Sequence, residues 1–244
     1  RSGPTPFRFT IDRSAYPSFR ESQIRSTSDI LDAELVYLYY DGEIVDSVTP
    51  ALGPTTGGTS AAIRGRNFLD LPSLACKVGA AVVPGTFRSS ELVVCDIPPS
   101  SEVFGTDEGF SDGRHLASTR ITVSNNGIDW HEEQSATFSY YREPRLVSLH
   151  PSVVPPEGGT VVQIHFEGDL VEGHDEVMVQ LGEMIVPANV SRQVILFETP
   201  VLPVGSVAAV RIALNSIDFS ADALELYVKD TPVLYEVLPP IGPA

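Results

Sequence analysis

The sequence contains IVDSVTPALGPTTGGT at residues 44–59 and repeats the pattern as RLVSLHPSVVPPEGGT at residues 145–160. The two copies share two prolines and a glycine pair at one constant offset: Pro50, Pro54 and Gly57-Gly58 in the first, and Pro151, Pro155 and Gly158-Gly159 in the second. A third copy begins in VLYEVLPPIGPA (233–244), where Pro239 and Pro243 keep the proline spacing. Self-similarity at a fixed period indicates tandem domains of one architecture.

Each copy of the pattern follows an apolar strand that ends in or near tyrosine, as in LVYLYYDG (35–42), TFSYYREP (137–144) and LELYVKDT (224–231). We therefore divide the chain into four parts. Residues 1–41 are expected to be the last hairpin of a preceding repeat, 42–141 and 142–229 two complete repeats, and 230–244 the first strand of a following repeat. This division predicts a longer parent protein with further repeats on both sides.

The apolar residues within each repeat alternate with polar ones, which is typical of strands with one face on a core. Clear cases are TSAAIRGRNF (59–68), TVVQIHFEG (160–168), and two strands around Gly182. Asn126-Gly127 is a strong hairpin signal, and the Gly-Gly pairs are expected to permit positive φ before the next strand. About seven short strands per repeat, and no persuasive amphipathic helix, predict an all-β chain of tandem Ig-like sandwiches.

The charge of the chain argues against one class of partner. Sixteen basic and thirty-two acidic residues give a net charge of −16, which repels the phosphate backbone of nucleic acids. The acidity favours solubility first, and second an association with cations or a basic partner. No apolar run is long enough to span a bilayer, so we expect no membrane contact by this segment.

The two cysteines, Cys76 and Cys95, lie in or beside apolar strand-like stretches, LACKV (74–78) and LVVCDIPP (92–99). A disulfide between them would close a loop of about 20 residues and stabilise the fold by about 3 kcal/mol. Buried free thiols are the main alternative, and a reactive cysteine is a third.

These features resemble the IPT/TIG family of Ig-like domains. The resemblance rests on SVTPALGPTTGGTSAAIRGRNF (47–68), Cys76, LVVCDIPP (92–99), VSNNGIDW (123–130) and FSYY (138–141). The second repeat keeps the prolines, the glycine pair, Gly168 and LFETP (196–200), but lacks both cysteines, so any disulfide is confined to the first repeat. The resemblance also implies an aromatic core residue at Trp130. It says little about function, because the family includes surface receptors, Rel-like DNA binders and modules of glycan-active enzymes.

No candidate for catalysis or for a resident metal emerges. The spacing of the histidines matches no zinc pattern, and His165 is expected to face outward on a strand; the five are His115, His131, His150, His165 and His174. No Gly-x-Ser-x-Gly sequence is present, and the carboxylates lie in turns. The loop at 103–116 carries Asp107, Glu108 and Asp112, which favour a solvated loop first and a weak Ca²⁺ site second. VEGHDE (171–176) is interpreted as a polar turn. We therefore expect no cofactor and no metal.

Asn189-Val190-Ser191 is an N-glycosylation sequon, and we expect Asn189 to carry a glycan if its side chain points outward. The leading hypothesis is a non-catalytic segment of a large extracellular glycoprotein, acting in adhesion, receptor spacing or an extracellular filament or coat. Other proteins, or copies of the chain itself, would bind through sandwich faces and edge strands. An intracellular or ciliary scaffold built from the same repeats is the alternative, and an accessory domain of a glycan-active enzyme is a third class.

Overall fold

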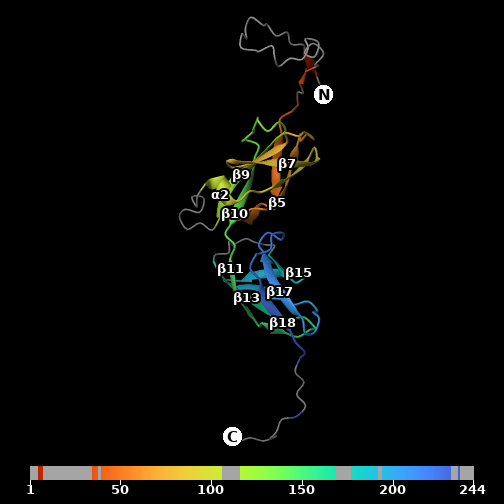
Figure 1. The fold of residues 1–244 in the computed structure, drawn as a ribbon, viewed down its shortest axis with the longest axis vertical. Coiled ribbons are helices and arrows are strands. Elements are labelled where there is room, and N and C mark those ends of the chain that lie inside the picture. The colour runs from red at the N-terminus through yellow and green to blue at the C-terminus, as the bar shows by residue number, and fades with distance from the viewer. Residues whose placement is uncertain are drawn as a thin grey trace, which may run out of the picture. The chain divides into compact units, whose positions relative to one another are not determined.

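The computed structural model describes residues 5–7, 35–37, 40–105, 116–168, 177–191, 194–231 and 236 (Figure 1). The chain divides into two compact units, residues 1–42 and 43–244. In the first unit, β1 (Thr5–Phe7) pairs antiparallel with β2 (Leu35–Tyr37). The expected hairpin of a preceding repeat at 1–41 and strand of a following repeat at 230–244 lie mostly outside the described residues, so both remain predictions.

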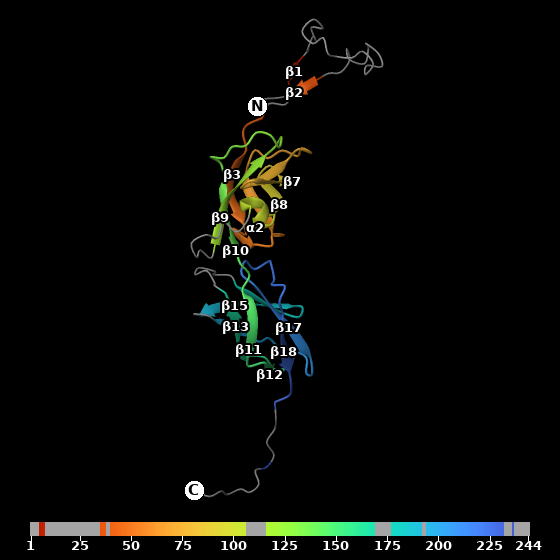
Figure 2. The same cartoon turned by 60° about the vertical axis from the view of Figure 1, so that its left-hand side comes forward.

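The second unit contains two β-sandwiches (Figure 2). The first sandwich is built from eight strands in the order β3-β5-β8-β7-β6-β9-β10-β4. Their bounds are β3 Ile44–Thr49, β4 Leu52–Pro54, β5 Ser60–Arg66, β6 Ala75–Val78, β7 Ala81–Ser89, β8 Leu92–Asp96, β9 Leu116–Ser124 and β10 Ala136–Tyr141. Alternating burial along β5 confirms that its period-two pattern has one face on the core.

The second sandwich repeats this topology with the order β11-β13-β16-β15-β14-β17-β18-β12. Its strands are β11 Arg145–His150, β12 Val153–Val154, β13 Val161–Glu167, β14 Met178–Leu181, β15 Met184–Ser191, β16 Val194–Glu198, β17 Val207–Ala213 and β18 Leu224–Val228. The two strands predicted around Gly182 are β14 and β15. The all-β, Ig-like fold class is thereby confirmed.

One strand in each sandwich passes from one layer to the other. The first half of β7 pairs with β6 and its second half pairs with β8, and Pro84 is the last residue of the first half. In the second sandwich β15 does the same between β14 and β16, with Pro187 as the last residue paired to β14. A proline suits this point because it has no N–H to donate and interrupts the ladder where the strand changes partner.

Each sandwich encloses its own hydrophobic core. The first is built around fully buried residues such as Ile63, Ile121 and Phe138, and the second around Ile164, Ile195 and Leu226. The strand registers place Cys76 of the first sandwich where the second has Val179, and Cys95 where it has Phe197. At the two positions where the first sandwich has disulfide-bonded cysteines, the second sandwich therefore has apolar side chains.

The glycine pairs have the positive φ that the sequence predicts, with Gly57 and Gly58 at 74° and 88° and Gly158 and Gly159 at 79° and 75°. The first glycine of each pair also lies against backbone. A Cβ on Gly57 would lie 2.5 Å from Pro99 N, and one on Gly158 would lie 2.8 Å from Pro200 C. Positive φ and close approach together require glycine at these two positions.

Three details differ from the sequence-based expectations. Eight strands per sandwich are assigned rather than about seven, because β4 and β12 are too short to show a period. A short helix, α2 (Ser100–Phe104), follows β8 and was not predicted, since five residues cannot display helical periodicity. Asn126-Gly127 does not join a tight hairpin, because β9 ends at Ser124 and β10 starts only at Ala136.

The only helix in the described part of the chain is α2, which is far too short to cross a bilayer, and the described residues contain no helical membrane span.

The glycine pair gives a matched test. Gly57→Ala is expected to lower the free energy of unfolding by about 2–4 kcal/mol, because strain at positive φ adds to a clash with the Pro98-Pro99 backbone. Gly58→Ala has the same backbone strain but no atom within 4 Å of the added Cβ, so it is expected to cost only about 1–2 kcal/mol. Urea unfolding of both variants measures the difference, and equal losses would contradict the close approach.

Candidate functional site

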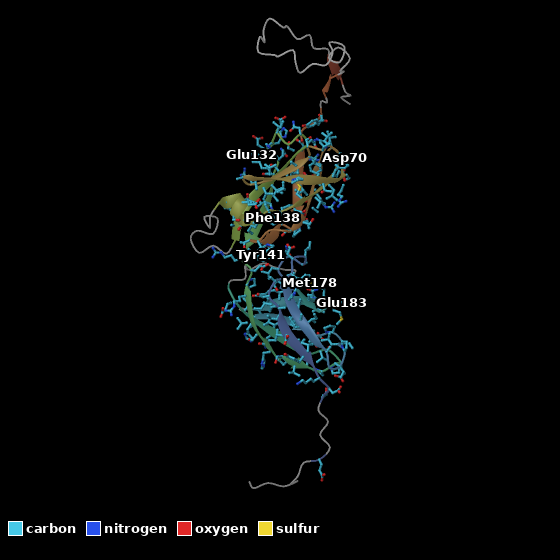
Figure 3. All side chains as sticks on the ribbon, viewed as in Figure 1. Asp70, Glu132, Phe138, Tyr141, Met178 and Glu183 are labelled. Carbon is cyan, nitrogen blue, oxygen red and sulfur yellow. A yellow bond between two sulfur atoms is a disulfide. The ribbon has the colours of Figure 1, made fainter. Side chains whose placement is uncertain are left out.

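The candidate site is the joint between the two sandwiches, and two successive tyrosines at the end of β10 define its apolar part; Figure 3 labels the second of them, Tyr141. Tyr140 is fully buried in the first core, where its ring meets Phe138 edge to face and its hydroxyl donates to the carbonyl of Pro98 at 2.8 Å. Tyr141 is 3% exposed but belongs to the second core, near Ile212 and Leu214. Adjacent side chains of one strand therefore anchor two different sandwiches.

A polar contact reinforces the joint from the loop after β17. Asn215 Nδ2 donates to the carbonyl of Leu52 at 2.9 Å, and Thr59 Oγ1 donates to Asp218 Oδ2 at 2.6 Å. Asn215 Nδ2 also donates to Asp218 Oδ2 at 2.7 Å, so one carboxylate oxygen accepts from both sandwiches. Thr59 is fully buried, and Leu52 packs partly against the second core. The joint therefore combines an inserted aromatic ring with charge-assisted hydrogen bonds.

Acidic side chains gather beside this contact. Desolvation at the joint raises the pKa of Glu143 although much of its side chain is exposed, and the nearby carboxylates of Asp222 and Asp218 raise it further. Burial also raises the pKa of the Tyr141 hydroxyl, with smaller effects from Asp218 and Glu143. No group of three or more metal-ligating side chains occurs in the described parts of the chain, so these acids are not assigned a metal.

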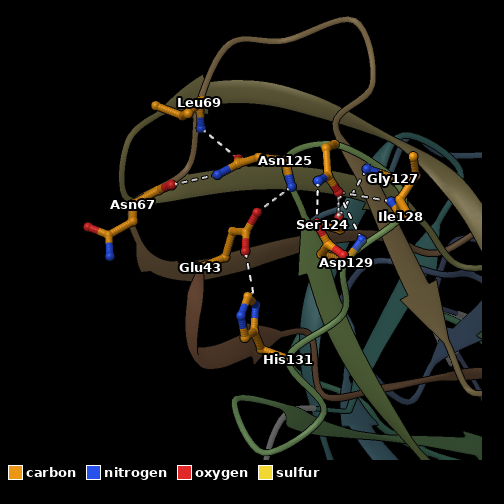
Figure 4. Close-up of polar contacts among 10 residues, drawn as sticks. Glu43, Asn67, Leu69, Ser124, Asn125, Gly127, Ile128, Asp129 and His131 are labelled. Atoms are coloured by element: carbon orange, nitrogen blue, oxygen red, sulfur yellow. Dashed lines mark hydrogen bonds and ion pairs between the residues drawn. The ribbon is translucent and has the colours of Figure 1, made fainter. Parts of the chain in front are cut away.

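A second polar network lies in the first sandwich around Asn125, which is fully buried (Figure 4). Its side-chain oxygen accepts from Leu69 N at 2.8 Å and its Nδ2 donates to the carbonyl of Asn67 at 2.9 Å. Its backbone N–H donates to Glu43 Oε1 at 2.5 Å, while Glu43 Oε2 lies 3.2 Å from His131 Nδ1. These hydrogen bonds satisfy Asn125 inside the sandwich, whereas the buried Glu43 Oε2 accepts no hydrogen bond and has His131 as its ion-pair contact.

The cysteines and the sequon take up defined positions. Cys76 of β6 and Cys95 of β8 form a disulfide, with Cα atoms 6.4 Å apart and both side chains buried in the first core. Because β6 and β8 belong to different layers, this bond links the two layers of the sandwich. Asn189 lies exposed on β15, between the inward-facing Ala188 and the exposed Val190. Its outward position meets the condition set for glycosylation, which remains a proposal.

The histidines that the structure describes lie at separate places in the two sandwiches. His150 and His165 are exposed, as expected for His165, and His131 contacts Glu43. The remaining candidates lie outside the described residues, namely His115, His174, Asp107, Glu108, Asp112 and the turn at 171–176. Among the residues that the structure describes, no histidine belongs to a group of three or more metal-ligating side chains.

The expectation of a core position for Trp130 was wrong. Trp130 is half-buried, with Lys77 Nζ 5.9 Å from its ring centroid. Lys77 lies between the inward-facing Cys76 and Val78 of β6 and therefore points away from the core, where it also pairs with Glu132 at 2.8 Å. Trp130 therefore lies beside Lys77, on the outer face of the sheet.

The joint itself was missed from the sequence. The strings ITVSNNGIDW (121–130) and RIALNSIDF (211–219) resemble each other, and local patterning alone predicts no more than strands and a turn in each. Both contain Asn-x-Ile-Asp, whose side chains carry the contact at Asn215 and Asp218. Thr59 and Asp218 are 159 residues apart, so no local pattern indicates their contact.

Comparison with known proteins places the first sandwich in a family. Residues 44–140 match the IPT/TIG domain family. Plexin-A4 of Danio rerio is 27% identical over 126 residues, which cover 49% of this chain and 6% of that protein. This chain thus spans only a small fraction of that relative's length.

One solved structure supports the fold. The plexin A4 full extracellular region, domains 1 to 10, aligns with a TM-score of 0.52 at 16% identity, covering 82% of this chain and 17% of that one. A second structure of that region, with domains 1 to 8, aligns at 20% identity over 78% of this chain and 18% of that one, but its TM-score of 0.42 is too low to support an inference.

Removal of the disulfide is expected to weaken one sandwich only. The pair Cys76→Ala and Cys95→Ala is predicted to lower the unfolding free energy of the first sandwich by about 3 kcal/mol or more, because an unfolded-state restraint of 19 residues is lost. Calorimetry of wild type and variant measures the shift. The double variant Val179→Ala and Phe197→Ala is the matched control and should destabilise the second sandwich instead. If loss of the disulfide lowered the unfolding free energy of both sandwiches equally, the two cores would not be independent.

Glu143 at the joint is expected to make the stability of the fold depend on pH. Because the pKa of Glu143 is raised in the folded chain, its contribution to stability is full below the ordinary value of 4.5 and is lost as the pH rises through the folded pKa. Glu143→Gln is therefore predicted to flatten the fall in stability above pH 4.5, by well under about 1 kcal/mol since the residue is exposed and screened. Urea unfolding between pH 4 and 8 measures this. Glu183→Gln, exposed in the β14–β15 turn, is the charge-matched control and should leave the profile unchanged.

Proposed function

Because residues 44–140 form an IPT/TIG domain, we propose that this chain is a non-catalytic segment of the extracellular part of a multi-repeat surface receptor. In this role it holds the neighbouring parts of the receptor at a fixed spacing and orientation. The second sandwich, with the same strand order, is proposed to be a second repeat of the same family. The similarity in sequence to plexin-A4 supports the receptor class, and the plexin A4 extracellular region shares the fold.

The observation that carries the spacing role is the joint. Tyr141 leaves the strand that ends the first sandwich and enters the second core, and Asp218 accepts a hydrogen bond from Thr59. Removing Tyr141 from this environment would expose a large aromatic side chain, at a cost of about 1.5–3 kcal/mol. Relative motion of neighbouring domains is the default unless contacts oppose it. A large rotation here would withdraw Tyr141 and break the Thr59–Asp218 hydrogen bond, so we propose that the joint favours one relative orientation, which is what a spacer requires.

The extracellular location rests on two further features. A buried disulfide persists in oxidising compartments and is rare in the cytosol. An exposed sequon at Asn189 is accessible to glycosylation in the secretory pathway. The net charge of −16 supports binding to proteins rather than nucleic acids, and we propose that other proteins or copies of this chain bind through sandwich faces and edge strands.

Peptide mass spectrometry under non-reducing conditions, on protein from its native source, tests this location. The expected result is a Cys76–Cys95 linked peptide together with a glycan on Asn189. Ser191→Thr keeps the sequon and should keep the glycan, whereas Ser191→Ala should remove it while leaving Asn189 in place. Free thiols with an unmodified Asn189 would overturn the extracellular role and favour an intracellular or ciliary scaffold built from the same repeats.

A further inference from the structure

The turn at Asn126–Asp129 in the first sandwich has the same internal hydrogen bonds as the turn at Asn215–Asp218 in the second. In the first, Asn126 Oδ1 accepts from Ile128 N at 3.0 Å and from Asp129 N at 2.9 Å. In the second, Asn215 Oδ1 accepts from Ile217 N at 3.2 Å and from Asp218 N at 2.8 Å. The two turns are therefore the same Asx-type structure.

The match extends to the side-chain clamp and the backbone. Asn126 Nδ2 donates to Asp129 Oδ2 at 2.7 Å, and Asn215 Nδ2 donates to Asp218 Oδ2 at 2.7 Å. The residue after each asparagine has a left-handed backbone, with φ of 69° at Gly127 and 67° at Ser216. A serine held at positive φ is unusual for a non-glycine residue, so the geometry is maintained in the second turn against a backbone penalty.

In the second sandwich this turn is the part that binds the sandwich before it, through Asn215 to the Leu52 carbonyl and through Asp218 to the Thr59 hydroxyl. In the first sandwich the corresponding turn lies at the surface, with Asn126 half-buried. Asp129 is exposed, and Ile128 at the tip is 78% exposed, compared with 54% for the corresponding Ile217. Tyr40 also precedes Ile44 by the same number of residues as Tyr141 precedes Arg145.

We propose that the Asn126–Asp129 turn is a docking surface for the end of another sandwich of this type, one that presents a backbone carbonyl and a threonine hydroxyl as Leu52 and Thr59 do. The proposal rests on the spacing role proposed above and extends it. Asn126 supplies the amide donor to the carbonyl, and Asp129 supplies the carboxylate that accepts from the hydroxyl. The same contact would then join the first sandwich to a sandwich ahead of it.

An in-frame duplication of residues 41–141 within the full chain tests this. The splice joins residue 141 of the first copy to residue 41 of the second copy, which keeps the register of the natural joint. The Leu52 and Thr59 end of the first copy then precedes the Asn126–Asp129 turn of the second copy. The turn of the first copy has no sandwich ahead of it within the duplicated segment, so it serves as the undocked reference in the same molecule.

Hydrogen–deuterium exchange of the peptides that contain these turns gives the readout. Ile128→Val in the first copy changes the mass of its peptide, so the two copies are read separately. The turn of the second copy is expected to exchange several-fold more slowly than that of the first, because opening it requires release of the docked sandwich. Thr59→Val in the first copy, which is nearly isosteric, should abolish this difference.

Thr59→Val in the second copy is the matched control, since it removes only the contact with Asp218. It should accelerate exchange of the Asn215–Asp218 turn and leave the Asn126–Asp129 turns unchanged. Equal exchange of the two Asn126–Asp129 turns, with the Asn215–Asp218 turn still protected, would overturn the docking surface and leave the spacing role intact. If neither Thr59→Val substitution accelerated exchange in any of these turns, both the docking surface and the spacing role would be overturned.

Discussion

A single peptide step, from Tyr140 to Tyr141, connects the two cores. Successive side chains of a strand point to opposite faces, so β10 directs Tyr140 into the first core and Tyr141 into the second. Only residues 142–144 then separate β10 from β11. The next strand therefore starts beside the ring that the previous one has inserted, and neither sandwich can turn far without withdrawing an aromatic side chain from a packed environment.

The contacts of the second sandwich follow from this placement. With Tyr141 inserted, the loop after β17 lies against the end of the first sandwich, where Asp218 and Asn215 find the Thr59 hydroxyl and the Leu52 carbonyl. The same closeness leaves Glu143 near the carboxylates of Asp218 and Asp222. Favourable packing and hydrogen bonding thus coexist with several carboxylates close together, and these carboxylates contribute to the raised pKa of Glu143.

Much of the fold could be predicted from sequence because its causes are local. Alternating burial in β5, and positive φ at Gly57 and Gly158, follow from patterns that lie within a few residues. The two-residue strand β12 and the passage of β15 between layers at Pro187 depend on pairing with distant strands. The prediction for Trp130 was wrong for the same reason, since it lies in the loop between β9 and β10 beside Lys77, an outward-facing residue of the distant strand β6.

The candidate site was less predictable than the fold. The sequence indicated the disulfide and the sequon as local features, and it displayed the repeated Asn-x-Ile-Asp without revealing what that motif contacts. A hydrogen bond between Thr59 and Asp218 depends on how one sandwich is seated on the next, which only the tertiary structure provides. Likewise, only the strand register shows that Val179 and Phe197 of the second sandwich occupy the positions of the two cysteines of the first.

Nuclear magnetic resonance relaxation of backbone ¹⁵N across both sandwiches tests the central claim, that the joint fixes their relative orientation. The account predicts that amides of residues 44–141 and 145–228 fit one shared rotational diffusion tensor, and that Tyr141→Ala separates them into two. Two independent and faster correlation times in the wild-type chain, each typical of a single sandwich, would contradict the account.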